Sequence, residues 1–219
     1  MSASFTCKAI LFDLDGVLVN SAECVERTWR AWSARHGFNA DAVISVAHGR
    51  RTIETVRAVA PQLNAASEVT ELEANEAMTA EGVYEIDGAR ELVSALPSDR
   101  WAVVTSGTRV IAEFRLNLVG IPIPEVMVCA DEISQGKPNP EGYFTAAARL
   151  EMEPGECIVI EDTPAGIEAG QAAKMRVIAV AGTYTADRLS RADVVAARLR
   201  DLQIEASGEN MTVLVEESR

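Results

Sequence analysis

The stretch AILFDLDGVLVN, residues 9–20, joins a short apolar run to two carboxylates and a glycine. The apolar residues 10–12 predict a buried strand that ends at Asp13. Asp13 and Asp15 are two residues apart, so they lie on the same side of an extended backbone, and Gly16 lets the chain turn away. Like charges held this close repel each other unless a cation or a shared proton offsets them, so the pair predicts a hard divalent metal ion. The alternative is an Asp-Gly turn with a solvated acidic neighbour.

A second polar loop follows the apolar run 101–104, which also predicts a strand. Thr105, Ser106 and Gly107 come directly after it, and a helix with one apolar face follows from about Arg109. Backbone N–H groups at a helix start point toward an anion, and Thr105 can add its hydroxyl. This segment therefore predicts either an oxyanion-binding turn or an ordinary N-cap.

Two more apolar runs, 126–130 and 157–160, end in polar groups. The first leads to GKPNP, where a glycine and a proline flank Lys137, and a rigid backbone is unusual for a merely solvated lysine. The second ends in Glu161 and Asp162, so a strand again delivers carboxylates at its C-terminal end. The runs 176–180 and 193–196 predict further strands, and 211–215 predicts a terminal edge strand.

Strands that alternate with helices predict an α/β fold, a Rossmann-like, mainly parallel sheet with helices on both faces. Ligands of such open sheets bind outside the carboxyl ends of the strands. Four independent loops carry polar groups to that edge, and their convergence predicts a catalytic site.

Residues 20–79 contain helical periodicity and no strand-like run. Asn20 and Glu23 have the spacing of a capping pair, Trp29 and Trp32 recur at helical spacing, and Gly37 stands where a helix stop is expected. We therefore expect a small all-helical cap domain at 19–82, inserted into a core catalytic domain formed by 1–18 and 83–219.

The link AHGRRT, residues 47–52, is unusually cationic for this acidic protein. Arginine offers a planar fork of donors to phosphate or hydroxyl-rich ligands, so His48, Arg50 and Arg51 are candidates for substrate contact. The alternative is a solvated helix start.

The composition excludes several classes of protein. The net charge of −13 and the sequence pI of about 4.6 argue against nucleic acid or an anionic membrane as the main partner. Residues 1–6 are too short for a signal peptide, and no apolar run reaches the roughly 18–20 residues that span a bilayer, so we expect a cytoplasmic protein. The four cysteines show no metal-binding or redox spacing, and we expect them to be reduced and structural.

With these motifs in place, the chain resembles the haloacid dehalogenase superfamily of phosphohydrolases along nearly its whole length. The resemblance rests on LFDLDGVL, VVTSG, GKPNP and IEDTPAG, with a helical cap after the first motif. HGRRT and TSGTR look most like the sugar- and polyol-phosphate phosphatases of the β-phosphoglucomutase-like subfamily, the 2-deoxyglucose-phosphate and glycerol-phosphate type. Two turns depart from the pattern: Asp87 precedes Gly88 where a proline is common, and Lys174 stands where relatives usually have glycine.

The resemblance implies an aspartyl-phosphate mechanism with Mg²⁺ and a small phosphorylated metabolite. Asp13 would be the nucleophile and Asp15 the general acid and base. The implied Mg²⁺ ligands are Asp13, the backbone carbonyl of Asp15, Asp162, and Glu161 through water. Thr105, the Ser106 N–H and Lys137 would hold phosphoryl oxygens. The substrate-binding candidates are His48, Arg50, Arg51, Ser106, Gly107 and Arg109.

Three alternatives remain at this point. A phosphosugar mutase uses a similar core but transfers the phosphoryl group without water. A phospho-acceptor signalling module gathers similar residues at a sheet edge, although it would lack the helical insertion and an aspartate two residues after the nucleophile. A non-catalytic ligand binder on the same fold is the third. For the oligomeric state we expect a monomer or a weak dimer.

Overall fold

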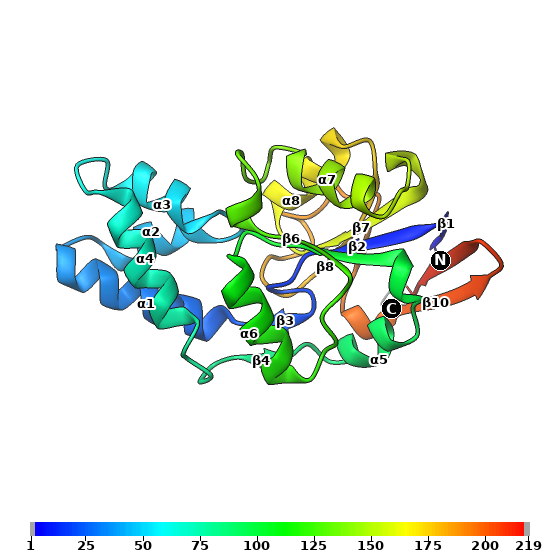
Figure 1. Cartoon of the computed structure of the whole chain (residues 1–219), viewed down its shortest axis with the longest axis horizontal. Coiled ribbons are helices and arrows are strands. Elements are labelled where there is room, and N and C mark those ends of the chain that lie inside the picture. Colours follow the sequence, from blue (N-terminus) through cyan, green and yellow to red (C-terminus); the bar gives the residue numbers. More distant parts are fainter. Residues whose placement is uncertain (1–2, 217–219) are drawn as a thin grey trace.

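Six parallel strands form the central sheet of the protein in the order β6-β5-β2-β7-β8-β9 (Figure 1). The structure is a computed structural model that describes residues 3–216, so the outer ends of the expected core domain, residues 1–2 and 217–219, lie outside it. The strands are β2 (Ala9–Phe12), β5 (Trp101–Val104), β6 (Val126–Val128), β7 (Cys157–Glu161), β8 (Arg176–Val180) and β9 (Val194–Ala196). This arrangement confirms the predicted α/β fold class.

Helices cover both faces of this sheet, which explains why its central strands read as continuous apolar runs. On one face, α7 (Glu141–Arg149) and α8 (Pro164–Ala172) pack on a core that includes Leu11 and Val159. On the other, α5 (Ala89–Ser94) and α6 (Arg109–Val119) pack on a core that includes Phe12 and Ile160. Figure 1 shows the first pair above the sheet and the second pair below it.

A separate three-stranded antiparallel sheet lies at the end of the molecule where both termini meet (Figure 1). Its order is β1 (Ala3–Cys7), β11 (Asn210–Val215), β10 (Leu202–Ser207). The predicted strand at 211–215 exists, but it is the central strand of this sheet and not an edge. It is central because a hairpin pairs it with β10 while β1, from the other end of the chain, pairs with its second edge.

Four helices, α1 (Ala22–His36), α2 (Ala40–Ala47), α3 (Thr52–Val59) and α4 (Ala65–Glu76), lie together beyond the sheet (Figure 1). They enclose a hydrophobic cluster of their own that includes Trp29, Trp32, Val56 and Leu72. The chain enters and leaves this unit through β3 (Val19–Asn20) and β4 (Tyr84–Glu85), which pair antiparallel. Both tryptophans thus belong to this core, with ring centroids 5.4 Å apart.

The start of α1 differs from the expected capping pair. Asn20 belongs to β3, and Ser21 is the N-cap residue, yet the Ser21 side chain makes no cap hydrogen bond. Its hydroxyl instead donates to Asp15 at 2.6 Å. Gly37 does end the helix in the left-handed conformation, with φ 74°.

Short 3₁₀ helices occur at Ser98–Arg100, Ala130–Glu132, Pro154–Glu156 and Leu199–Asp201. All four cysteines are free and buried, as expected, and burial raises the pKa of the Cys129 and Cys157 thiols to about 12. Among residues 3–216, no helix has both the length and the apolar character needed to span a bilayer.

Candidate active site

The carboxyl ends of three adjacent strands, β5, β2 and β7, deliver the candidate catalytic groups to one place. Parallel pairing aligns Phe12 with Val103 and Ile160, so the residues that follow each strand emerge side by side. The loop before α7 adds Lys137 to this group. The residues brought together are Asp13, Thr105, Lys137, Glu161 and Asp162, all of them buried.

Lys137 lies at the centre of the buried charges. Its Nζ donates to Asp13 Oδ1 at 2.5 Å, to Glu161 Oε1 at 2.7 Å and to the Val104 carbonyl at 3.1 Å. Burial lowers the pKa of this ammonium, but the carboxylates of Asp13 and Glu161 outweigh burial and hold the pKa well above its usual value. Lys137 is therefore charged at any physiological pH.

Glu161 is surrounded by donors. Its Oε1 accepts from Lys137 and from the Tyr143 hydroxyl, and its Oε2 accepts from the backbone N–H groups of Asp162 and Thr163 and from the Thr163 hydroxyl. Burial raises the pKa of Glu161, but Lys137 and the N–H donors reverse the direction and lower it. A Cβ at Gly166 would stand 1.7 Å from Oε1, so only glycine fits against this carboxylate. Glu161 thus organises the site as a fixed anion.

Asp162 is the opposite case. Among the described residues, both of its carboxylate oxygens are buried without a hydrogen-bond partner. Burial, together with the charges of Glu161 and Asp13, raises its pKa well above the usual value, although the nearby Thr183 hydroxyl and Lys137 act in the opposite direction. Burial also raises the pKa of Asp13, to about 7, against the opposing charge of Lys137.

One oxygen from each of Asp13, Glu161 and Asp162 lies within 4.8 Å of the others. Buried carboxylates without partners are costly unless a cation neutralises them. All-oxygen donors of this kind suit a hard divalent cation. The residues present therefore fit a metal ion, with Asp162 supplying the free oxygens.

The Asp15 side chain does not join this group of three carboxylates. Its Oδ1 accepts from the Ser21 hydroxyl at 2.6 Å and from Arg115 Nη1 at 2.7 Å. Arg115 Nη2 in turn donates to Glu76 at 2.7 Å, and Glu76 lies at the end of α4. Asp15 is therefore held at the boundary between the sheet edge and the four-helix unit.

The turn after β5 links the sheet edge to the four-helix unit. Thr105 is buried, and its Oγ1 accepts from the Gly107 N–H at 3.0 Å, which closes a tight turn before α6. The Ser106 hydroxyl donates to the Gly49 carbonyl at 3.0 Å and so connects this turn to the α2–α3 loop.

A cavity of about 430 Å³ opens over these groups, within the size range of small-ligand sites. Asp13, Asp15, Thr105, Ser106 and Gly107 line it from the sheet edge. The four-helix unit contributes Val25, Trp29, His48, Arg50 and Glu76. The cavity therefore lies between the helical unit and the sheet, and two of the three cationic candidates of the HGRRT link reach it.

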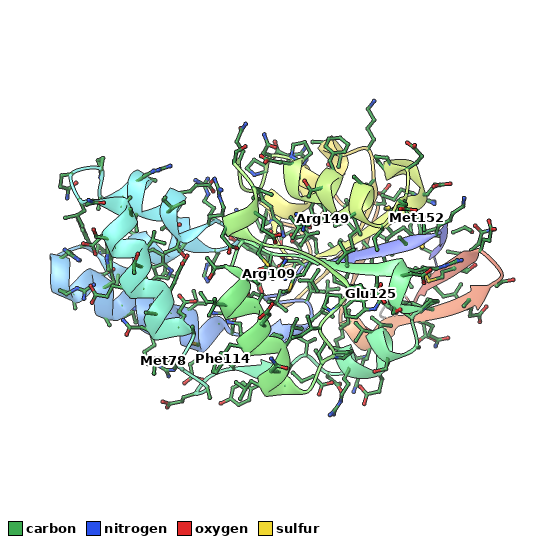
Figure 2. All side chains as sticks on the ribbon, in the orientation of Figure 1. Met78, Arg109, Phe114, Glu125, Arg149 and Met152 are labelled. Atoms are coloured by element: carbon green, nitrogen blue, oxygen red, sulfur yellow. The ribbon has the colours of Figure 1, made fainter. Side chains whose placement is uncertain are left out.

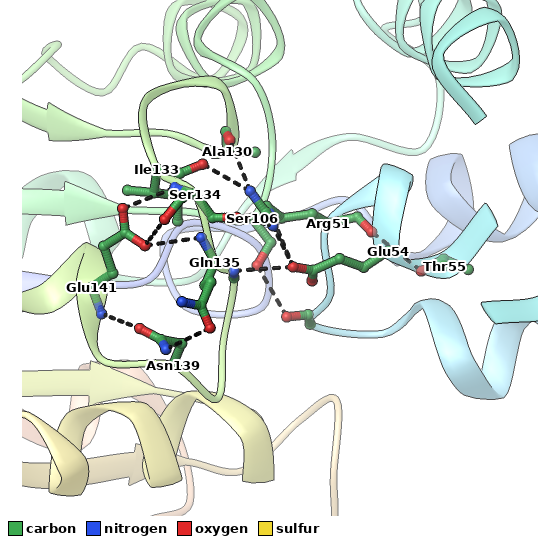
Figure 3. A network of polar contacts seen from close by, with 12 residues as sticks. Arg51, Glu54, Thr55, Ser106, Ala130, Ile133, Ser134, Gln135, Asn139 and Glu141 are labelled. Atoms are coloured by element: carbon green, nitrogen blue, oxygen red, sulfur yellow. Dashed lines mark hydrogen bonds and ion pairs between the residues drawn. The ribbon is translucent and has the colours of Figure 1, made fainter. Parts of the chain in front are cut away.

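Arg51, the third, does not line this cavity, contrary to the expectation of ligand contact. Its side chain is buried, and the guanidinium donates to Glu54 and to the carbonyls of Ile133 and Ser134, both at 2.9 Å (Figure 3). Glu54 also accepts from the Gly136 N–H at 3.0 Å. The Arg51 guanidinium binds backbone carbonyls instead of facing the cavity, because the 130–136 loop presents several carbonyl groups beside the start of α3.

Arg109 is a second predicted substrate-binding residue that does not line the cavity. Its guanidinium donates at 2.8 Å to both the Met127 carbonyl and Glu132. Arg149, labelled with it in Figure 2, donates to the same two residues from α7. Arg109 opens α6 with its side chain at the edge strand β6, so it braces the sheet instead of facing the site.

Sequence reasoning missed Ser21, Glu76 and Arg115. The sequence did contain a signal for Glu76 and Arg115. The buried face of α6 consists of Ile111, Ala112, Arg115 and Leu116, so a charged residue interrupts an apolar face. In α4 the buried positions are Leu72 and Glu76, one helical turn apart. A charge on a buried helix face needs a partner, which points to a buried ion pair.

The comparisons with known proteins agree with this geometry. The sequence model of the haloacid dehalogenase-like hydrolases matches residues 10–180. The chain is 40% identical over 203 residues to hexitol phosphatase A of Escherichia coli, covering 90% of this chain and 94% of that protein. It is 36% identical over 198 residues to glycerol-1-phosphate phosphohydrolase 2 of Saccharomyces cerevisiae, covering 85% and 79%. The crystal structure of β-phosphoglucomutase from Clostridium difficile superposes with a TM-score of 0.78 at 22% identity, covering 90% of this chain and 93% of that one, which shows a shared fold.

Proposed function

The chain belongs to the haloacid dehalogenase-like hydrolase family, and from this we propose that it is a Mg²⁺-dependent phosphatase of small sugar or polyol phosphates. The names of its relatives support this substrate class, because the two relatives above are a hexitol phosphatase and a glycerol-1-phosphate phosphohydrolase. The observation that carries the proposal is the buried group at the sheet edge, where Asp13 meets Lys137 and Asp162, whose carboxylate has no hydrogen-bond partner among residues 3–216.

We propose that Asp13 attacks the phosphorus in line and forms an aspartyl-phosphate. The O–P bond to the alcohol breaks as the bond to Asp13 forms, and Asp15 gives its proton to the departing oxygen. Water then attacks the phosphoryl group, Asp15 takes the proton of that water, and Asp13 and inorganic phosphate are released. The Lys137 ammonium, 2.5 Å from Asp13, offsets the negative charge of the phosphoryl group.

A bound Mg²⁺ would neutralise charge on the phosphoryl oxygens. Asp13, Asp162 and the backbone carbonyl of Asp15 are the groups proposed to hold it, with Glu161 through water. Thr105 and the Ser106 N–H are proposed to bind the remaining phosphoryl oxygens. Both line the cavity, which supports this role.

The proposed cap domain is residues 19–82, and the proposed core is 1–18 with 83–219. The separate hydrophobic cluster of α1 to α4 and the paired crossings β3 and β4 support this division. We propose that the cap covers the substrate and that His48 and Arg50 contact its non-reacting end, since both line the cavity. A cytoplasmic monomer or weak dimer remains our expectation.

Phosphosugar mutase activity is the second candidate, because the β-phosphoglucomutase structure shares the fold. The two activities use one phospho-enzyme and differ in the acceptor, which is water for a phosphatase and a sugar hydroxyl for a mutase.

The test is a screen of small phosphate monoesters with and without Mg²⁺, in which both inorganic phosphate and the organic product are measured. We expect stoichiometric phosphate and free alcohol from glycerol 1-phosphate or a hexitol phosphate. Isomerised sugar phosphate without phosphate release would establish the mutase. No turnover of any monoester would contradict both.

A further inference from the structure

A buried arginine joins the acid and base residue to the cap. Arg115, on α6, is 3% exposed at its side chain, and its two terminal nitrogens bind different carboxylates. Nη1 donates to Asp15 and Nη2 donates to Glu76, both at 2.7 Å. Asp15 comes from the loop after β2, whereas Glu76 is the last residue of α4. The arginine therefore contacts both sides of the cavity.

The contact fixes which oxygen of Asp15 can carry a proton. Both donors, Ser21 and Arg115, bind the same atom, Oδ1. An oxygen that accepts from a guanidinium and a hydroxyl is the poorer place for a proton, so a protonated Asp15 carries its proton on Oδ2. A general acid must present its proton within hydrogen-bond reach of the leaving oxygen. Because the Arg115 guanidinium holds Oδ1 in place, it also sets the direction in which Oδ2 points.

Stability alone is a weak explanation for this arrangement. Two carboxylates share one guanidinium inside the wall of the cavity, and among residues 3–216 the Arg115 Nε is buried without a partner. Apolar groups of similar size often replace buried ion pairs without loss of stability. Arginine differs from lysine in that its planar fork can bridge two acids in fixed directions.

We propose that Arg115 is a positioning residue for Asp15, and that Glu76 makes this positioning depend on the cap. The inference rests on the proposed function, because it assigns Arg115 to the proton transfer step. In that step Asp15 Oδ2 gives its proton to the bridging oxygen while the O–P bond to the alcohol breaks and the bond to Asp13 forms. When the cap moves away, Glu76 no longer accepts from Arg115, and the Arg115 guanidinium can then hold Asp15 in a different orientation.

The test uses two substrates that differ in their need for an acid. An alkoxide leaves poorly without a proton, so glycerol 1-phosphate depends on Asp15. The p-nitrophenolate ion leaves without one, so p-nitrophenyl phosphate does not. The quantity compared is kcat/KM, because it covers the steps up to departure of the leaving group and omits hydrolysis of the phospho-enzyme.

We expect Arg115→Lys, which keeps the charge but loses the fork, to lower kcat/KM for glycerol 1-phosphate about 10- to 100-fold, since a general acid contributes roughly 100- to 10,000-fold. For p-nitrophenyl phosphate we expect a loss below about threefold. Glu76→Gln should show the same selectivity with a smaller loss, and Asp15→Asn should show it most strongly. Arg191→Lys is the matched control, because Arg191 pairs with Glu168 on the surface, and it should change neither value.

Equal losses on the two substrates, or no loss on either, would overturn the role of Arg115. An unchanged Glu76→Gln variant would overturn the part that involves the cap. Circular dichroism and thermal melting of each variant identify misfolding. If Arg115→Lys misfolds, Ser21→Ala removes the other donor to Asp15 Oδ1 and should show the same selectivity between the two substrates. These failures are distinct from failure of the proposed function, in which the wild-type protein itself would release no phosphate.

Discussion

Asp162 shows most directly how the surroundings of a single side chain suit it to bind a cation. Among the described residues its carboxylate is buried without a partner, one residue after a glutamate that is bound by several donors. The two acids have opposite environments although they are adjacent in the chain. One organises the site, and the other is available to a ligand.

We expect Mg²⁺ to raise the melting temperature of the wild-type protein, because ligand binding to the native state stabilises it by about 2.7 kcal/mol at 100 times Kd. Asp162→Asn should remove this shift. Without metal the variant should be more stable than wild type by about 1 kcal/mol, because a buried, unpaired carboxylate is lost. Differential scanning calorimetry with NaCl at matched ionic strength as the control measures both effects, and an undiminished Mg²⁺ shift in the variant would contradict the assignment.

Lys174 provides a test of backbone strain outside the site. It follows α8 with φ 61°, in the left-handed region that favours glycine, and its side chain is exposed. Lys174→Gly should raise the free energy of unfolding by about 0.5–1 kcal/mol. Lys174→Ala, which keeps a Cβ, should give no such gain in urea denaturation. Equal effects of the two substitutions would show that the conformation carries no strain.

At the scale of elements, the α2–α3 loop shows how two neighbouring arginines differ. Arg50 is exposed and lines the cavity, whereas Arg51 is buried against the carbonyls of the 130–136 loop (Figure 3). Since Glu54 also accepts from Gly136, next to Lys137, Arg51 and Glu54 brace the loop that carries the lysine.

We therefore expect Arg51→Ala to lower kcat by a similar factor, about tenfold, on every substrate, and to destabilise the protein by about 2 kcal/mol because buried carbonyls lose their donor. Arg50→Ala should instead change the ranking of substrates by kcat/KM with little effect on stability. A panel of polyol and sugar phosphates separates the two variants. If Arg51→Ala changed the ranking of substrates, Arg51 would contact the substrate after all.

Helix α4 carries a half-buried acid whose ionisation depends on its surroundings. Burial, with Glu76 and Asp131 nearby, raises the pKa of Glu73 to about 7. The folded state therefore binds a proton at Glu73 more tightly than the unfolded state, so the contribution of this one residue to stability is greatest below about pH 4.5 and is lost as the pH rises through 7.

Glu73→Gln removes this loss because glutamine cannot ionise. We expect the variant to match wild type at pH 4 and to exceed it by about 1 kcal/mol at pH 8, a value reduced for the partial exposure of the side chain. Urea denaturation at the two pH values measures the difference. The same difference at both pH values would show that ionisation is not its cause.

The apolar strands and the helical insertion could be predicted because each has a strong local signal. The runs 101–104 and 176–180 match β5 and β8, since strands covered on both faces are apolar throughout. The pairing of β1 with β11 could not be predicted, because it joins opposite ends of the chain and half of β1 faces solvent. Pairing partners at such separation leave no local pattern.

Candidate site residues near the sheet edge were predictable because polar groups directly follow buried strands. Asp13, Thr105, Glu161 and Asp162 come together for this reason. The direction of a long side chain is set by tertiary contacts, so Arg51 and Arg109 could not be assigned from spacing. Arg115 was detectable only as a charge on an apolar helix face.

At the scale of the whole molecule, the site requires both parts of the chain. The sheet edge supplies Asp13 and the buried charges, and α1 to α4 supply Trp29, Arg50 and Glu76 to the same cavity. The chemistry is thus proposed for the core, and substrate selection for the cap. The Asp15–Arg115–Glu76 contacts join the two parts within the cavity wall.

In the proposed mechanism, Asp13 is the residue that receives the phosphoryl group. The most direct measurement is Mg²⁺-dependent phosphate release from a small polyol phosphate by wild type and by Asp13→Asn, with the fold of both verified by circular dichroism. We predict that the substitution lowers kcat by at least about 1,000-fold while the fold is unchanged, because the variant lacks the carboxylate proposed to form the covalent bond to phosphorus. Release by the folded variant at a rate comparable to wild type would contradict the account.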